Sequence, residues 1–187
     1  PSSAVIASPC NDMAVLAQSI MNSNNFRVYT TDDVVGVELG GALKNIIALG
    51  SGVCDGLGFG NNAKAAFITR GLAEISRLAV ASGANPLTLA GLSGMGDLIA
   101  TCSSTLSRNH FVGVQLSRGM NLAEITEKMD NVAEGVDTTL AATRLADNLC
   151  VDMPIANTAY DIMFRGLSVE KAISDLLERV PRGERLD

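Results

Sequence analysis

The chain has 187 residues and a net charge of −6, so it is long enough to bury one substantial core and too acidic for general nucleic-acid binding. A hydrophobic fraction of 47% with only 18% charged residues is typical of a globular protein and argues against disorder. No run approaches the roughly 18 apolar residues of a membrane-spanning helix, so we expect a soluble, intracellular protein without a membrane span.

The first part of the chain has the pattern of a strand, a helix and a second strand. These elements are predicted over residues 3–8, 12–22 and 26–29. A single pair of parallel strands cannot cover both of its own faces. We therefore expect the edge of a larger α/β sheet whose other strands precede Pro1, and we interpret the chain as a fragment. The boundary to the next part falls near residues 31–33.

The hydrophobic period becomes helical after this boundary and stays helical to the end. Residues 37–53 carry apolar positions at the spacing of a buried helix stripe, namely Leu39, Leu43, Ile46, Ile47 and Gly50. The other face places Lys44 among small residues, which are Gly40, Gly41, Ala48 and Ser51. A glycine inside a helix costs about 1 kcal/mol relative to alanine. We therefore expect a ligand or another backbone to approach this face closely.

Cap residues and glycine stops predict the remaining helices. Asparagines at the starts and glycines at the ends give the clearest signals. Five expected helices have both ends set, at residues 63–82, 106–118, 136–149, 155–165 and 168–180. A further helix should begin at Pro86 and end by the glycines at 94 and 96, and the next should begin at Asp97. A short helix should begin at a capping box formed by Asn121 and Glu124. The tail after Pro181 is polar, and we expect it to fray.

The cysteines show neither a zinc pattern nor a redox pattern. The four cysteines are Cys10, Cys54, Cys102 and Cys150. They lie far apart in the sequence, and no two of them form a CxxC motif. We expect reduced, mostly buried thiols and no metal site.

Several segments that contain glycines also hold polar residues whose positions are hard to explain as ordinary surface residues. Taken alone, Lys44 is as well explained as a solvated helix lysine as by a catalytic role. Asp97 follows a GMG run and is most simply a helix N-cap, on one helix face with Thr101.

The helix start at Ser107, Arg108 and Asn109 combines backbone N–H groups with a guanidinium, which suits a phosphate group. The single histidine, His110, is more often packed or solvent-exposed than catalytic, and we leave it out of the site.

Motifs along the whole chain resemble one known family. They are VELGGALKN (37–45), DGLGFGNNAKAA (55–66), TRG (69–71), GMGDL (94–98) and LSRN (106–109). In this order they resemble the signature blocks of NAD(P)-dependent glycerol-3-phosphate dehydrogenases of the bacterial and plastid-like branch. The family's glycine-rich phosphate loop and its GPSF-type block, with its own lysine, are not in this chain.

The resemblance implies a mainly α fold class. Residues 32–187 would form a helical domain similar to the C-terminal domain of 6-phosphogluconate dehydrogenase, which binds the substrate. Residues 1–31 would be a βαβ remnant of the NAD(P)-binding Rossmann sheet. The cofactor, NAD or NADP, would bind mainly in the missing N-terminal domain, and the residue that distinguishes the two lies there.

The resemblance also implies roles for residues. The reaction would be hydride transfer between sn-glycerol 3-phosphate and dihydroxyacetone phosphate, which supplies a phospholipid precursor. Lys44 would be the acid/base lysine, oriented by Asp97. Substrate contacts would come from Lys44, Asn45, Asp97, Thr101, Ser107, Arg108 and Asn109. Cofactor contacts would come from Arg108, Val132 and Glu134.

Two other functions remain open from the sequence. A related 3-hydroxyacid or ketopantoate-type dehydrogenase shares this architecture. The alternative outside the enzymes is a helical dimerisation module without catalytic activity. The expected partners are the substrate and the chain's own N-terminal Rossmann domain, with a homodimer left open. We expect a cytoplasmic location, with the plastid stroma as the alternative.

Overall fold

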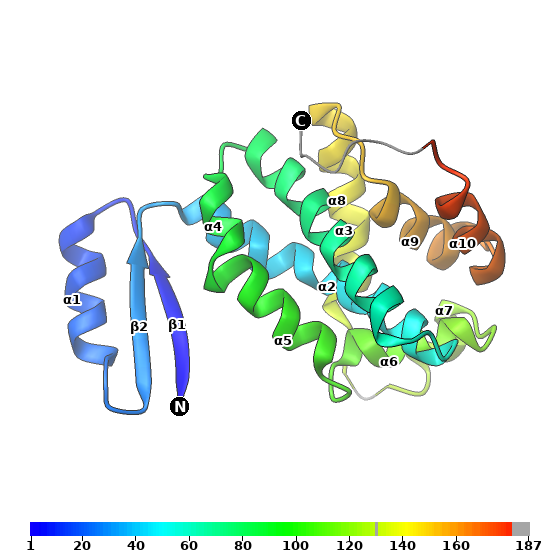
Figure 1. The fold of residues 1–187 in the computed structure, drawn as a ribbon, viewed down its shortest axis with the longest axis horizontal. Helices are drawn as coiled ribbons and strands as arrows, with labels where there is room; N and C mark the ends of the chain where they lie inside the picture. Colours follow the sequence, from blue (N-terminus) through cyan, green and yellow to red (C-terminus); the bar gives the residue numbers. More distant parts are fainter. Residues whose placement is uncertain (130, 181–187) are drawn as a thin grey trace.

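The computed structural model describes residues 1–129 and 131–180, and it consists of a small parallel sheet unit followed by a body of helices (Figure 1). Strand β1 (Ser2–Ala7), helix α1 (Asn11–Met21) and strand β2 (Phe26–Thr31) form the unit. The strands pair in parallel, with Ser2 opposite Phe26 and Ala7 opposite Thr31. This arrangement confirms the predicted order of strand, helix and strand.

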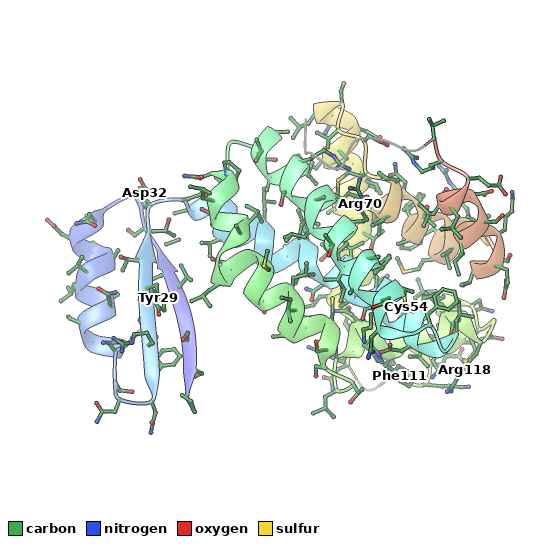
Figure 2. The ribbon with its side chains drawn as sticks, in the orientation of Figure 1. Tyr29, Asp32, Cys54, Arg70, Phe111 and Arg118 are labelled. Carbon is green, nitrogen blue, oxygen red and sulfur yellow. The ribbon has the colours of Figure 1, made fainter. Side chains whose placement is uncertain are left out.

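The sheet unit lies at one end of the molecule (Figure 1), and several of its large apolar side chains are exposed. On α1, Met13, Leu16 and Ile20 are all exposed, and so is Tyr29 on β2, which Figure 2 labels. In folded proteins such a stripe normally packs against another layer. The exposed apolar faces are therefore consistent with a larger sheet, which stays a prediction.

The long helix α2 (Val34–Gly56) runs through the helical body. It begins where the Asp33 side chain accepts a hydrogen bond of 2.8 Å from the backbone N–H of Gly36. Its length and composition would allow it to cross a membrane, but half of the relevant window is buried, as in the core helix of a globular protein. The predicted absence of a membrane span stays a prediction.

Most of the other helices pack against α2, while α7 packs on α6 and α10 on α9, which confirms the mainly α fold class. They are α3 (Asn61–Ala81), α4 (Pro86–Ala90), α5 (Asp97–Ser103), α6 (Arg108–Ser117), α7 (Leu122–Thr126), α8 (Glu134–Leu149), α9 (Pro154–Arg165) and α10 (Val169–Leu177). The capping box of Asn121 and Glu124 is present as predicted. The tail from residue 181 lies outside the described residues.

Apolar side chains of α2 contribute to two clusters in the helical body. Ile46 and Ile47 lie in the cluster that α3, α5, α8 and α9 complete, and Leu49 lies in the cluster formed with α6, α7, α9 and α10. Fully burying side chains of this size contributes about 1.5–3 kcal/mol each. The stability of the helical body therefore depends strongly on α2.

The small residues of α2 allow other backbones to come close. The sequence predicted the close approach of either a ligand or another backbone, and the structure shows the second. A Cβ atom at Gly40 would lie 2.6 Å from the Ser93 carbonyl oxygen, and one at Gly52 would collide with the His110 carbonyl oxygen on α6. From the other side, a Cβ at Gly113 of α6 would collide with the Leu49 carbonyl oxygen. The glycines of α2 and α6 thus set the distance between the two helices.

The segment between α4 and α5 differs from the sequence prediction. The helix that begins at Pro86 ends at Ala90, and a π-helical turn spans Leu92–Gly96. A Cβ at Gly94 would collide with the backbone of Leu89, so this tight path requires glycine.

The N-cap role predicted for Asp97 is wrong, because Asp97 is already helical and Gly96 occupies the cap position. The prediction of mostly buried thiols holds for Cys54 and Cys102, whereas Cys10 and Cys150 are exposed.

Candidate active site

Lys44 and Asp97 form an ion pair between the middle of α2 and the start of α5. The lysine Nζ donates to Oδ2 of Asp97, and Oδ1 of the same carboxylate accepts a hydrogen bond of 3.4 Å from the Thr101 hydroxyl. The side chains of Lys44 and Asp97 are 20% and 38% exposed. An ammonium group with one carboxylate partner therefore remains accessible to solvent and to a small ligand.

Two buried asparagines connect α2 to the starts of α6 and α8. Nδ2 of Asn109 donates to Oδ1 of Asn45 at 3.0 Å, and Oδ1 of Asn109 accepts from the Gly135 N–H at 2.9 Å. Nδ2 of Asn45 reaches Oε2 of Glu134 at 3.5 Å. Because Asn45 follows Lys44 directly on α2, these contacts bring Asn109 and Glu134 next to the lysine segment. In this state the two amides bind protein groups.

Ser107 and Arg108 form the start of α6. The Ser107 hydroxyl caps the helix by accepting from the backbone N–H of His110 at 3.4 Å. Arg108 is exposed, and its guanidinium makes no hydrogen bond or ion pair with residues 1–129 or 131–180. This forked cation, at the positive end of a helix dipole, is available to an anionic ligand.

Val132 is the predicted site residue that the structure leaves apart from the others. It is 65% exposed and precedes α8, where Glu134 is also exposed. Within the described parts of the chain, Glu134 is linked by a hydrogen bond to Asn45, which pairs with Asn109. Val132 is associated with these residues only because it lies two positions before Glu134 in the sequence. The predicted ligand roles of all these residues stay predictions.

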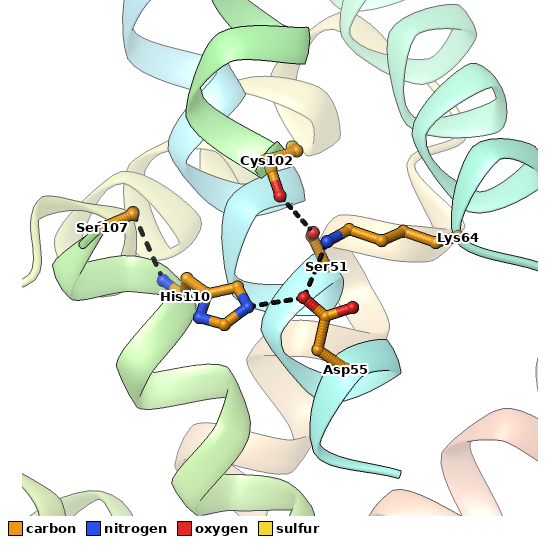
Figure 3. Close-up of polar contacts among 6 residues, drawn as sticks. All are labelled: Ser51, Asp55, Lys64, Cys102, Ser107 and His110. Carbon is orange, nitrogen blue, oxygen red and sulfur yellow. Dashed lines mark hydrogen bonds and ion pairs between the residues drawn. The ribbon is translucent and has the colours of Figure 1, made fainter. Parts of the chain in front are cut away.

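A polar cluster that the sequence reasoning missed lies where α2 ends (Figure 3). Oδ2 of Asp55 is 2.7 Å from Nε2 of His110 and 2.7 Å from Nζ of Lys64. Burial acts to raise the pKa of Asp55, but hydrogen bonds and charges from Lys64 and His110 outweigh it, so the pKa is lowered. The only available signal was that DGLGFGNNAKAA holds both Asp55 and Lys64.

Ser51 anchors α5 to α2 close to this cluster. Its hydroxyl donates to the Cys102 carbonyl oxygen at 2.9 Å (Figure 3). Burial raises the pKa of Cys102 to about 11 and also raises that of Cys54, so both thiols stay protonated at neutral pH. Among the described residues, no group of three or more His, Cys, Asp or Glu side chains could hold a metal ion.

A buried carboxylate, Glu74, was also missed. Glu74 on α3 is 1% exposed, and its two oxygens accept hydrogen bonds of 2.8 Å from the backbone N–H groups of Ile155 and Ala156. These groups belong to the first turn of α9, whose free N–H groups attract a negative charge. Burial outweighs these contacts and raises the pKa of Glu74 to about 7.

A family model described as "NAD-dependent glycerol-3-phosphate dehydrogenase C-terminus" matches residues 33–174. A relative named glycerol-3-phosphate dehydrogenase (NAD(P)+) from Pelotomaculum thermopropionicum is 54% identical over 96% of this chain and 51% of its own length. One of the same name from Dehalococcoides mccartyi is 52% identical over 95% of this chain and 49% of its own length. The chain thus spans about half the length of the curated relatives that it matches.

Solved structures agree with the sequence matches. A crystal structure of glycerol-3-phosphate dehydrogenase from Coxiella burnetii superposes with a TM-score of 0.91 at 37% identity, covering 96% of this chain and 55% of that one. A structure of the Saccharomyces cerevisiae enzyme gives a TM-score of 0.79 at 28% identity, covering 88% and 48%. The helical body and the strand unit therefore follow an arrangement found in known enzymes.

Proposed function

We propose a function from one premise: this chain belongs to the NAD-dependent glycerol-3-phosphate dehydrogenase family, whose C-terminal model it matches over residues 33–174. The family resemblance drawn from the motifs is thereby confirmed. Because the chain spans about half the length of its relatives, it acts as the substrate-binding half. Residues 32–187 form the helical substrate domain, and residues 1–31 complete an N-terminal nucleotide-binding domain. We call the two parts together the full-length enzyme.

The proposed reaction interconverts sn-glycerol 3-phosphate and dihydroxyacetone phosphate. The nicotinamide of NAD or NADP, bound mainly in the N-terminal domain, supplies the hydride chemistry. On this chain, the unpaired guanidinium of Arg108 and the exposed carboxylate of Glu134 are suited to polar contacts with a dinucleotide. Val132 next to Glu134 offers an apolar contact. The bacterial origin of the relatives supports a cytoplasmic location rather than the plastid stroma.

Lys44 is the acid/base group in this proposal. During reduction, negative charge develops on the C2 oxygen of the substrate, and the Lys44 ammonium stabilises that charge and donates the proton. In the oxidative direction the neutral amine accepts the proton from the C2 hydroxyl. Asp97 fixes the direction of the lysine side chain, and Thr101 in turn fixes the Asp97 carboxylate. The partial exposure of the ion pair supports this role, because a substrate can reach it.

Arg108 and the start of α6 hold the substrate phosphate. The guanidinium can make paired hydrogen bonds to phosphate oxygens, and the N-terminal N–H groups of a helix with ten residues favour an anion. This local positive site explains how a chain with a net charge of −6 can bind a dianion. Asn45 and Asn109 lie close enough to Lys44 to contact a bound substrate after small rearrangements.

The observation that carries the proposal is the Lys44–Asp97 ion pair between α2 and α5, in a chain of this family whose Asn45–Asn109 hydrogen bond joins the lysine segment to the helix start that bears Arg108. The test follows NADH and NADPH oxidation by the full-length enzyme with dihydroxyacetone phosphate, ketopantoate and a 3-oxoacid. Reduction of the phosphorylated ketone at least about 100-fold faster, in kcat/KM, would support it. Equal or faster reduction of an acid without phosphate would overturn it in favour of a related hydroxyacid dehydrogenase.

A further inference from the structure

Three helices meet at the Asp55 carboxylate. Asp55 lies in the last turn of α2, Lys64 in the first turn of α3 and His110 in the first turn of α6 (Figure 3). Both donors reach the same oxygen at 2.7 Å, and the His110 side chain is only 9% exposed. The roles proposed above for Lys44 and Arg108 leave this cluster unused.

Asp55 continues the small-residue face of α2 that carries Lys44. Ser51 is seven residues and Asp55 eleven residues beyond Lys44, so all three lie within about 20° of one line along the helix. Each of them binds a different part of the site. Lys44 binds Asp97 at the start of α5, Ser51 binds the Cys102 carbonyl at the end of α5, and Asp55 binds His110 on α6.

The α6 contact lies in the same first turn as the residues proposed to hold phosphate. His110 is the third residue of α6, directly after Arg108 and Asn109. Close backbone approach at Gly52 sets how near the first turn of α6 comes to α2, because a side chain there would collide with the His110 carbonyl. The bond from the His110 ring to Asp55 adds a second restraint, which opposes rotation of that turn about the helix axis.

We propose that Asp55 is a positioning residue: by binding His110 and Lys64 it holds the first turn of α6 so that Arg108 faces the substrate phosphate. This inference rests on the proposed function. Asp55 itself does not touch the substrate. Lys64 keeps the carboxylate on the α6 side by binding the same oxygen, so α2, α3 and α6 are tied at a single point.

The main test compares two ketones in the full-length enzyme, dihydroxyacetone phosphate and dihydroxyacetone, which lacks the phosphate. In Asp55→Asn the KM for dihydroxyacetone phosphate should rise about tenfold, because small misplacement of a binding group is costly. The kcat at saturation should change less than about twofold, and kcat/KM for dihydroxyacetone should stay as in the wild type. If Asp55 had a merely structural role, Asp55→Asn would instead lower the thermal midpoint and reduce kcat/KM for both ketones to the same extent.

Three further variants keep the inference testable whether or not Asp55→Asn folds. Lys64→Gln removes one donor at the edge of the cluster and should raise the KM for the phosphorylated ketone about two- to fivefold. His110→Gln keeps a side-chain N–H donor, so its KM for dihydroxyacetone phosphate should be closer to the wild-type value than the KM of His110→Ala. The matched control is Asp161→Asn, which removes an exposed partner of Arg165 on α9 and should leave both substrates unaffected.

Unchanged KM values in Asp55→Asn and Lys64→Gln would overturn the positioning role, and so would equal losses for both ketones. Neither result would affect the proposed function, which depends on the wild-type activity. If the wild-type enzyme did not reduce dihydroxyacetone phosphate at all, the proposed function would fail independently of Asp55.

Discussion

Lys44 and Glu74 are two ionisable side chains inside the same helical body, and their surroundings differ sharply. Glu74 is enclosed, and each of its oxygens accepts a backbone hydrogen bond from the first turn of α9. Among the residues that the structure describes, Lys44 has Asp97 as its one side-chain partner, and both groups are partly exposed. The enclosed carboxylate has its hydrogen-bonding capacity largely used by the fold, whereas the ammonium keeps donors available. We interpret the first as structural and the second as the proposed reactive group.

The largest expected effect is on the open side of this comparison. In the full-length enzyme, Lys44→Ala should lower kcat for dihydroxyacetone phosphate by about 10³-fold, because the proton donor and the charge at the C2 oxygen are lost together. The thermal midpoint should remain close to that of the wild type. Lys171→Ala, which removes an exposed lysine on α10 with its own aspartate partner, is the matched control. Full activity in Lys44→Ala would rule out the proposed role.

Removing the enclosed group should produce the opposite profile. Glu74→Ala leaves two buried N–H groups of α9 without acceptors and creates a cavity, so the free energy of unfolding should fall by about 3 kcal/mol. Denaturant unfolding of Glu74→Ala and of the exposed control Glu38→Ala measures the difference. KM and kcat of the fraction that folds should be unchanged. A large loss of kcat without a loss of stability would contradict the structural interpretation.

The pH dependence of stability sharpens the same contrast. Because burial raises the pKa of Glu74 from 4.5 to about 7, the folded state binds its proton more tightly than the unfolded state. The Glu74 contribution to stability is therefore fully present below pH 4.5 and is lost as the pH rises through about 7. This loss amounts to at most about 3 kcal/mol. Glu74→Gln, which does not titrate, should show a flatter profile of unfolding free energy between these pH values; an identical profile would refute the assignment.

The smallest of these effects concerns Arg108. Arg108→Leu should raise the KM for dihydroxyacetone phosphate about 10- to 100-fold, because a charge-assisted pair of hydrogen bonds to phosphate is lost. Arg118→Leu, at the opposite end of α6, is the control, and Figure 2 shows its exposed side chain. An unchanged KM in Arg108→Leu would remove this residue from the phosphate site.

Local patterns predicted the elements of this chain well. The helical period and the caps placed α2, α3 and α9 within about three residues of their observed ends. The glycine-rich face around Lys44 predicted the close approach of a ligand or of another backbone, and the structure shows the second at Gly40. These features depend on residues within one or two turns of each other, and such spacing is visible in the sequence.

The partners of the polar side chains could not be predicted in the same way. Asp97 looked like a helix cap, because GMG before an aspartate is a common start signal, but its carboxylate binds Lys44, 53 residues earlier. Glu74 binds α9 about 80 residues later, and His110 binds Asp55 across 55 residues. Periodicity carries no information about which helix faces which. The residue types at Ser107, Arg108 and Asn109 suggested a phosphate site by themselves, whereas the other proposed ligand roles came only from the family resemblance.

The connection between the sheet unit and α2 has a consequence for domain motion. Only Asp32 and Asp33 separate the end of β2 from the start of α2, and Asp33 accepts from the backbone N–H groups of Gly36 and Asn85. Figure 2 labels Asp32 where the chain leaves the sheet. Any movement of the sheet unit relative to the helical body would have to bend the chain at or beside these two residues, and Asp33 is held by its hydrogen bonds to the helical body. Lys44, Asp97 and Arg108 all lie on the same side of this connection, on the packed helices α2, α5 and α6, so such a movement would not by itself separate them.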